Sequence, residues 1–169
     1  FWYCSLSAFS NAVGPRRTLG DGIGESLRNA GLSRKETREK VEALLKDCGL
    51  PPEYAGRYPH QVSGGQCQRA AIARALAIAP RLLICDEITS ALDVTVQKEI
   101  LELLNALRTQ QGRGLSILFI SHDISLVQQF CDRVLVMYRG EIVEEGTPDE
   151  VIRNPQNDYT KRLIDSVLS

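Results

Sequence analysis

The chain has 169 residues, of which 43% are hydrophobic and 24% are charged, the composition of an ordinary globular protein with one core. Its formal net charge of −1 gives no reason to expect nucleic acid or an anionic membrane surface as a partner. Five scattered cysteines without a Cys-x-x-Cys pair argue against a disulfide framework or a zinc site, and favour buried thiols in a reducing cytosol.

The N-terminal part offers few signals of regular structure. The apolar start, Phe1–Phe9, lacks an initiating Met and a basic leader, so it is not predicted to be a signal peptide, and we expect a truncated chain. Residues 1–30 are expected to be irregular. The glycine-rich stretch Gly20–Gly24 is predicted to be a loop or a distorted helix start, because a dinucleotide fingerprint would follow a strand.

Two capping boxes predict helices in the next part of the chain. Ser33 with Glu36 opens the first helix, which Gly49 and the following proline end. Its buried face is expected to consist of Val41, Leu44, Leu45 and Cys48. After a loop containing His60, Ser63 with Gln66 opens an Ala-rich helix that we expect to run to about Ala79.

Alternating strands and helices are predicted downstream. The continuous apolar run Leu82–Cys85 is typical of a strand covered on both faces of a parallel sheet, and Ser116–Ile120 is expected to be a second buried strand. Between them, apolar residues at helical spacing predict a helix near 94–109, ended by Gly112 and Gly114. Its expected apolar face is Ile100, Leu103, Leu104 and Leu107.

The C-terminal part is expected to hold a hairpin between short helices. A short helix carrying Leu126, Val127 and Phe130 should precede strand Val134–Tyr138, which turns at Arg139-Gly140 into Glu141–Glu145. The sequence Thr147-Pro-Asp-Glu150 combines an N-cap, a proline at the first helical position and a capping box. Asn154-Pro155 should end that helix before a last one over 159–168. The alternation predicts an α/β fold with a parallel sheet.

The turn Ser63-Gly-Gly-Gln66 has the chemistry of an anion site. Glycines allow backbone N–H groups to approach a phosphate, Ser63 supplies a hydroxyl, and the helix dipole favours negative charge. An ordinary capped helix after a turn is the plainer alternative for this short motif alone. Asp86 and Glu87, which follow the apolar run directly, place two adjacent carboxylates at a strand end, as a Mg²⁺–phosphate reaction needs.

Together these residues resemble the signature sequence and the Walker B segment of ATP-binding-cassette (ABC) ATPases. The resemblance implies a partial P-loop NTPase-like ABC nucleotide-binding domain: the helical subdomain and the C-terminal half of the parallel-sheet core. It implies that Ser63, Gly64, Gly65 and Gln66 contact the γ-phosphate of ATP held by the opposite subunit. It also implies that Asp86 reaches Mg²⁺ through water and that Glu87 polarises the attacking water.

Two further motifs fit the resemblance. Ser90-Ala-Leu-Asp93 resembles the D-loop, although Asp93 also suits a helix N-cap, and both roles can hold at once. His122, at the end of the second predicted strand, resembles the switch histidine that contacts the γ-phosphate. Ser121-His-Asp123 is not a hydrolase triad, because three consecutive residues cannot converge their side chains.

Three short motifs resemble the ATPase subunits of dipeptide, oligopeptide and nickel importers: Tyr58–Gln61, Asp93–Gln97 and Asn154–Thr160. The chain departs from the family in having no Gly-Lys dipeptide, and hence no phosphate-binding loop. Counting back without gaps puts Ser7 where the family has its Q-loop glutamine, and Ile88 stands where most relatives have proline.

We accordingly expect four segments: an atypical junction over 1–14, a helical subdomain with the signature over 15–80, the Walker B, D-loop and switch-histidine part of the core over 81–146, and a C-terminal extension over 147–169. The expected function is the ATP-hydrolysing subunit of a peptide or nickel importer. A degenerate cassette that lends its signature to a partner is the alternative, and a cassette protein of translation or repair is disfavoured by the C-terminus.

The implied ligands are ATP as substrate and Mg²⁺. The implied partners are a second ATPase subunit, transmembrane permease subunits and, indirectly, a solute-binding protein, at the cytoplasmic face of the membrane. The chain by itself should be inactive without a phosphate-binding loop. A bulky residue at Gly65 is expected to block the approach to phosphate while leaving the chain folded.

Overall fold

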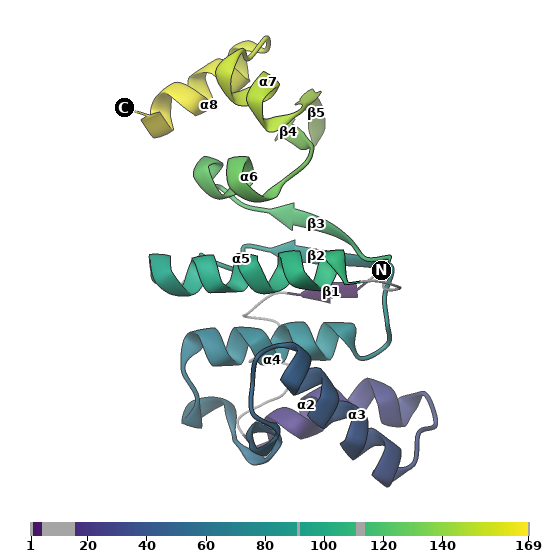
Figure 1. The fold of residues 1–169 in the computed structure, drawn as a ribbon. Coiled ribbons are helices and arrows are strands. Elements are labelled where there is room, and N and C mark those ends of the chain that lie inside the picture. The colour runs from purple at the N-terminus through teal and green to yellow at the C-terminus, as the bar shows by residue number, and fades with distance from the viewer. Residues whose placement is uncertain (1, 5–15, 91, 111–113, 169) are drawn as a thin grey trace. The chain divides into compact units, whose positions relative to one another are not determined.

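The computed structural model describes residues 2–4, 16–90, 92–110 and 114–168, with only the backbone described for 2–4, 167 and 168. The chain forms two compact units that divide after Ile120, and each is described by itself. Figure 1 labels the elements of both. Those of the first unit are β1 (Trp2–Cys4), α2 (Leu19–Asn29), α3 (Arg34–Asp47), the 3₁₀ turns η1 (Pro52–Gly56) and η2 (Pro59–Gln61), α4 (Gly64–Leu76), β2 (Leu82–Asp86), α5 (Val94–Thr109) and β3 (Ser116–Ile120).

The expectation that residues 1–30 are irregular is wrong in two places. Trp2–Cys4 is a strand that pairs in parallel with β2. The glycine-rich stretch lies inside α2, which Thr18 opens with a capping box to Asp21. The glycine at position 20 has a packing reason, because a Cβ there would lie 2.7 Å from the carbonyl oxygen of Ala55 in η1. This close approach between segments far apart in sequence leaves no local signal.

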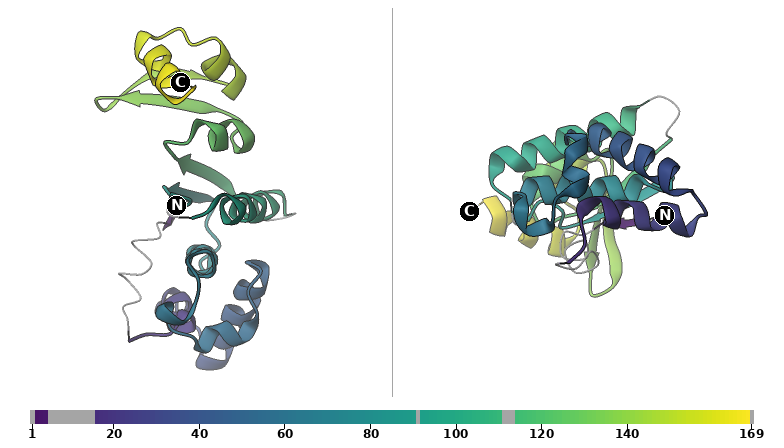
Figure 2. Two further views of the ribbon diagram at one scale, coloured as in Figure 1. Left: turned by 90° about the vertical axis from the view of Figure 1, so that its left-hand side faces the viewer. Right: turned by 90° about the horizontal axis from the view of Figure 1, so that it is seen from below.

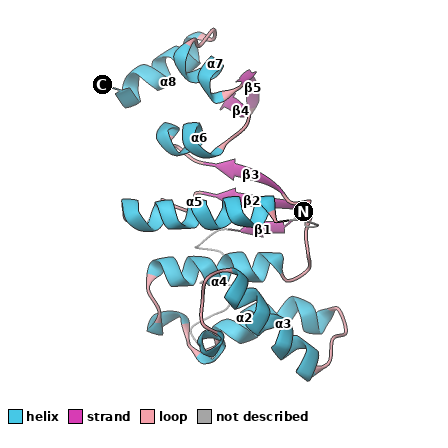
Figure 3. Cartoon of the chain, viewed as in Figure 1, coloured by secondary structure: helices cyan, strands magenta, loops and turns pink. Residues whose placement is uncertain are grey.

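Helices α3 and α4 begin where the capping boxes predicted. The expected apolar face of α3 is buried, and Gly49 follows the helix with φ +70°. Helix α4 ends at Leu76, three residues before the predicted end at Ala79. Ala79 has φ +49°, a left-handed conformation that ends the helical course before Pro80. Figure 3 shows α3 and α4 on the same side of the three sheet strands of this unit.

The sheet of the first unit has the parallel order β1-β2-β3, as the α/β pattern predicted. Its burial is lower than expected. Leu83 and Cys85 of β2 are fully buried, whereas their neighbours on the strand are half-buried, and Leu118 and Ile120 of β3 are 43% and 44% exposed. Figures 1 and 2 show α5 along one face of this sheet. Strand β3 is its edge, so the expectation of burial on both faces is wrong within the described part of this unit.

Helix α5 has the predicted bounds, and Asp93 caps it by accepting from the N–H of Val96 at 3.0 Å. Its buried residues are Ile100, Leu101, Leu104 and Leu107, so Leu101 takes the place predicted for Leu103, which is half-buried. Gly114, with φ +55°, lies between α5 and β3. Gly112, the other predicted helix stop, lies outside the described residues.

The second unit contains α6 (Ile124–Phe130), β4 (Val134–Tyr138), β5 (Glu141–Gly146), α7 (Pro148–Arg153) and α8 (Asp158–Leu168). Strands β4 and β5 form the predicted antiparallel hairpin. Arg139 and Gly140 both have positive φ, at 50° and 86°, as a tight two-residue turn requires. Thr147 caps α7 through the predicted box with Glu150. No helix in the described part of either unit is long and apolar enough to cross a membrane.

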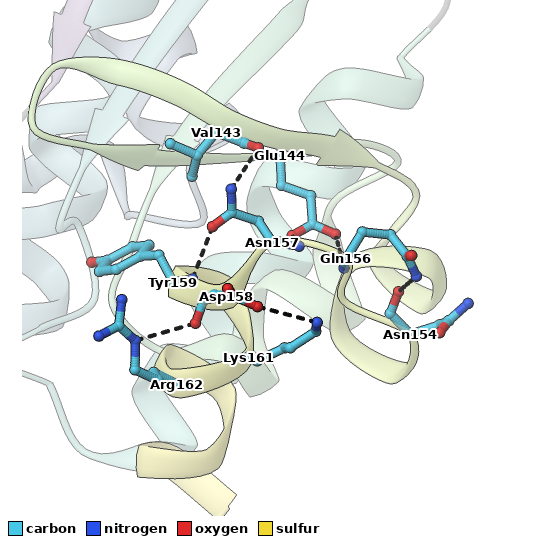
Figure 4. Close-up of polar contacts among 9 residues, drawn as sticks. All are labelled: Val143, Glu144, Asn154, Gln156, Asn157, Asp158, Tyr159, Lys161 and Arg162. Carbon is cyan, nitrogen blue, oxygen red and sulfur yellow. Dashed lines mark hydrogen bonds and ion pairs between the residues drawn. The ribbon is translucent and has the colours of Figure 1, made fainter.

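The importer-like motif over residues 154–160 holds the second unit together locally (Figure 4). The carboxylate of Glu144 accepts from the backbone N–H groups of Gln156 and Asn157 at 2.8 and 3.1 Å. The Asn157 side chain donates to the carbonyl of Val143 and accepts from the N–H of Tyr159. The ring of Tyr159 stacks on Tyr138 with centroids 4.1 Å apart. These contacts fix the start of α8 against the hairpin.

This carboxylate should make the second unit sensitive to acid. Desolvation raises the pKa of Glu144, but hydrogen bonds, chiefly from the N–H of Gln156, outweigh it and hold the pKa below the usual value. The resulting stability is present above the pKa of the unfolded chain and is lost as pH falls through the folded value. The protection factors of the α8 amides, which correct for the intrinsic pH dependence of exchange, should therefore fall as pH drops below the ordinary carboxylate pKa, and Glu144→Gln should remove that fall.

Glu141→Gln, a change at an exposed carboxylate of the same hairpin, is the matched control and should keep the pH dependence. An identical acid response in the Glu144→Gln variant would contradict the assigned role of Glu144.

Candidate functional site

The turn before α4 is built by a reciprocal capping box. The Ser63 hydroxyl accepts from the N–H of Gln66 at 3.3 Å, and the Gln66 side-chain oxygen accepts from the N–H of Ser63 at 3.0 Å. A hydroxyl that accepts in this way still has its own proton to donate. The N–H groups of the first helical turn have no acceptor within a helix, and the box takes only that of Gln66. The turn therefore offers donors suited to an anion.

The side-chain amide of Gln66 is engaged at both ends. Besides closing the capping box, it donates through Nε2 to the hydroxyl of Tyr54 at 3.2 Å. The guanidinium of Arg57 lies over the Tyr54 ring at 4.0 Å from its centroid. Gln66 therefore holds the turn on η1, and any contact from it to a phosphate would follow a rearrangement, because its backbone N–H already donates to Ser63.

The two glycines of the turn have different surroundings. Gly64 is exposed, and a Cβ there would meet only Leu92 at 3.4 Å. Gly65 is buried, and a Cβ there would lie 2.5 Å from Cγ1 of Val96 in α5. The expectation that Gly65 can be replaced without affecting the fold is therefore wrong. Its small size is required by the contact between α4 and α5, and Gly64 is the glycine that faces outward.

The strand-end carboxylates lie where predicted, at the C-terminal end of β2. Asp86 is the last residue of the strand and is half-buried, and Glu87 is exposed. The N–H of Glu87 donates to the carbonyl of Ile120 at 3.0 Å, which ties this position to the end of β3. Glu87 has φ +47°, an uncommon conformation for a residue with a side chain. Such conformations are found preferentially at functional sites.

Local hydrogen bonds shape the loop that follows. The Ser90 hydroxyl donates to the Glu87 carbonyl at 2.9 Å, and the Gln97 side chain donates to the carbonyl of Thr89 at 3.0 Å. Ile88 is 1% exposed and belongs to the core. These bonds hold the described residues between Glu87 and Asp93, the N-cap of α5.

The structure brings the starts of α4 and α5 together. Gly65 meets Val96, in the first turn of α5, and Gly64 approaches Leu92 just before it. The signature turn and the segment Ser90–Asp93 are therefore neighbours within the first unit. His122 belongs to the second unit, where it is exposed and stands just before Asp123, the N-cap of α6.

The donor set fits a magnesium ion that arrives with phosphates. Mg²⁺ keeps several waters and takes one or two protein carboxylates together with substrate oxygens. Asp86 offers one half-buried carboxylate at a strand end. Within the described ranges no three His, Cys, Asp or Glu residues are grouped so as to hold a metal by themselves. The described residues therefore do not form a complete metal site without the phosphates of a substrate.

Sequence reasoning missed Arg69 and Val96, which contribute contacts between α4 and α5. Their importance comes from contacts between segments about thirty residues apart, and no local pattern reveals such contacts. The signal that could have been used is Gly65 itself, since a glycine inside a helix costs roughly 1 kcal/mol against alanine and needs a reason.

In the comparison with known proteins, one family model matches the chain, and the similar proteins are named as ATP-binding proteins of transporters. Residues 6–90 match the family model described as ABC transporter. The oligopeptide transport ATP-binding protein OppF of Escherichia coli (strain K12) is 50% identical over 158 residues, 92% of this chain and 47% of OppF. The glutathione import ATP-binding protein GsiA of Escherichia coli O157:H7 is 49% identical over 157 residues, covering 92% of this chain and 25% of GsiA.

The solved structures agree on the fold. A dimeric post-hydrolysis state of the ATP-binding cassette MJ0796, bound to ADP and Pi, is 32% identical with a TM-score of 0.68, and the match covers 80% of this chain and 58% of that one. A second dimeric structure of the same bacterial cassette gives a TM-score of 0.67. The chain spans less than half the length of the curated relatives and somewhat more than half of the cassette.

Proposed function

The chain belongs to the ABC transporter family, and on this basis we propose that it is part of the ATPase subunit of a peptide importer, with its signature turn acting on ATP held by a second subunit. The similarity to OppF and GsiA, named for oligopeptide transport and glutathione import, supports peptides over nickel as the solute class. The proposal gives the chain a place beside transmembrane permease subunits, at the cytoplasmic face of the membrane, with a solute-binding protein as an indirect partner.

The observation that carries the proposal is the outward-facing turn at Ser63 and Gly64, placed beside Asp93 at the start of the neighbouring helix. The Ser63 hydroxyl and the backbone N–H groups of the turn donate to the γ-phosphate of ATP bound by the opposite subunit. The positive end of the α4 dipole adds to the attraction. Asp93, as the N-cap of α5, holds the loop before that helix in a conformation that leaves room for the opposite subunit.

The remaining site residues act on ATP bound to the same subunit. Asp86 holds the Mg²⁺ of MgATP through a water molecule, and the ion neutralises phosphate charge when it is bound. Glu87 accepts a proton from the attacking water as general base, and the strained backbone at Glu87 fixes its direction. For His122 we keep the role that its motif implies, a contact with the γ-phosphate. The degenerate cassette, which offers only its signature turn, remains the alternative.

Two variants, each of which removes the same kind of capping interaction at a different helix, test the proposal. Ser63→Ala and Ser33→Ala each delete a hydroxyl that accepts from an N–H at 3.3 Å, so both should cost roughly 1 kcal/mol of stability. Only Ser63→Ala should weaken the ATP-dependent association of this chain with OppF, by about tenfold or more. The measurement is association with and without a non-hydrolysable ATP analogue. Equal loss in both variants would contradict a contact by Ser63.

The chain alone should bind MgATP weakly, because its 169 residues contain no Gly-Lys dipeptide and hence no phosphate-binding loop. Isothermal titration of the purified chain checks this. A dissociation constant of ~10 μM or tighter, about −7 kcal/mol, that is lost in Asp86→Ala would show that the chain holds ATP by itself.

A further inference from the structure

We infer that Arg69 is a positioning residue that sets the signature turn against the loop at the start of α5. Its guanidinium joins three helices. From its place in α4, Nη1 donates to the carbonyl of Cys48 at the end of α3 at 3.2 Å, and Nη2 donates to Glu99 of α5 at 3.0 Å. The inference rests on the proposed function, because it explains how that turn is aimed.

The surroundings of Arg69 are built to receive it. Gly49 has φ +70°, and a Cβ there would lie 2.9 Å from Nη1 of Arg69. The glycine thus ends α3 in a left-handed conformation and leaves room for the guanidinium beside the last helical carbonyls. A positive charge there is favoured by the negative end of the α3 dipole. The side chain of Arg69 is 18% exposed, so its hydrogen bonds are only partly open to water.

The contact between the N-termini of α4 and α5 is made by a backbone without a side chain on the α4 side. Gly65 contributes no side chain where it meets Val96. A cavity of about 300 Å³ lies beside the contact, lined by residues that include Ser63, Gln66, Arg69 and Glu99. A glycine contact next to a cavity resists sliding or rotation weakly, because few atoms are in contact. The two directed bonds of Arg69, one turn further along α4, supply the missing constraint.

The consequence is that Arg69 sets the position of the signature turn relative to the start of α5 without touching phosphate itself. Loss of its bonds lets the start of α4 move relative to Asp93, so the turn is presented in a range of orientations. Weaker ATP-dependent association should follow even though the turn's own residues are intact.

The first test is hydrogen exchange on the chain itself, which does not depend on any partner. In Arg69→Ala, amide exchange in the second turns of α4 and α5, where the N–H groups are hydrogen-bonded, should rise by about tenfold, with smaller changes in α2. Glu99→Ala, at a half-exposed side chain that leaves the bond to Cys48 in place, should give a smaller rise. Arg69→Lys should fall between, because an ammonium cannot reach both acceptors in the same geometry.

Arg38→Ala is the matched control. Arg38 also pairs with a glutamate, Glu42, at 2.8 Å, but that residue lies on the same helix, and the side chain of Arg38 is 82% exposed. Its removal should leave exchange in the second turns of α4 and α5 unchanged. An Arg69→Ala variant with unchanged exchange there, or with a uniform rise throughout the first unit, would overturn the inference.

The second test is the ATP-dependent association with OppF. Arg69→Ala should weaken it by about fivefold to tenfold and Arg69→Lys by less, while Arg38→Ala leaves it unchanged. Arg69→Ala association equal to that of the unchanged chain would overturn the positioning role. If the unchanged chain shows no ATP-dependent association at all, the proposed function fails, and the hydrogen-exchange result decides separately whether Arg69 joins the helices.

Discussion

Glu87→Gln, introduced into a full-length subunit that carries this sequence, should leave ATP binding intact and reduce turnover by about 10²–10⁴-fold. The amide has nearly the shape of the carboxylate, so it preserves the backbone conformation at φ +47° and the bond from the Glu87 N–H to Ile120. It cannot accept a proton from water. About 3 kcal/mol or more of barrier lowering should therefore be lost in the chemical step alone.

The measurement is steady-state hydrolysis together with equilibrium binding of ATP. Glu102→Gln, at an exposed position of α5, is the control and should keep both properties. Turnover above about half that of the unchanged subunit would contradict the role of Glu87, since a general base contributes far more than a factor of about 2.

Gly65→Ala should destabilise the first unit by about 1–3 kcal/mol, because the added Cβ would lie 2.5 Å from Cγ1 of Val96. Val96→Ala in the same chain should restore much of the stability. It removes the clashing methyl group and leaves the Cβ of residue 96 at 3.8 Å, an ordinary contact. Urea unfolding measures the change in the free energy of unfolding, and hydrogen exchange in α4 and α5 shows where in the first unit it acts.

Gly64→Ala is the natural comparison, because its Cβ meets only Leu92 at 3.4 Å and the position is exposed. It should unfold like the unchanged chain and weaken only the ATP-dependent association. Equal unfolding of the Gly64→Ala and Gly65→Ala variants would show that α4 and α5 do not approach as closely at Gly65 as the structure indicates.

Local signals predicted the starts of helices well. The boxes at Ser33, Ser63 and Thr147 hold their caps through residues three positions apart, so the sequence contains the whole interaction. Helix α2 also begins with such a box, at Thr18, but its glycines suggested a loop, and the contact that explains Gly20 is with Ala55, far along the chain. The need for glycine at position 65 has the same long-range origin, because a Cβ there would meet Val96 of α5.

Burial was the least predictable property of the sheet. The apolar run at β2 and the one at β3 look alike in sequence, yet Leu83 is fully buried and Leu118 is 43% exposed. The difference arises from strand order, since β2 is central and β3 is the edge. The hydrophobicity of a strand does not reveal which strands pair with it. Sequence reasoning could therefore place the carboxylates of Asp86 and Glu87 at a strand end, but it could not predict what covers that strand.

The central claim is that the signature turn of this chain contacts the γ-phosphate of ATP held by another subunit. Photo-crosslinking tests it most directly, with an ATP analogue that carries a photoreactive group on the γ-phosphate, bound to OppF and mixed with this chain. The account predicts label on the tryptic peptide from Tyr58 to Arg69, and its loss in Ser63→Ala but not in Ser33→Ala. Label confined to OppF, or on this chain only outside that peptide, would contradict the claim.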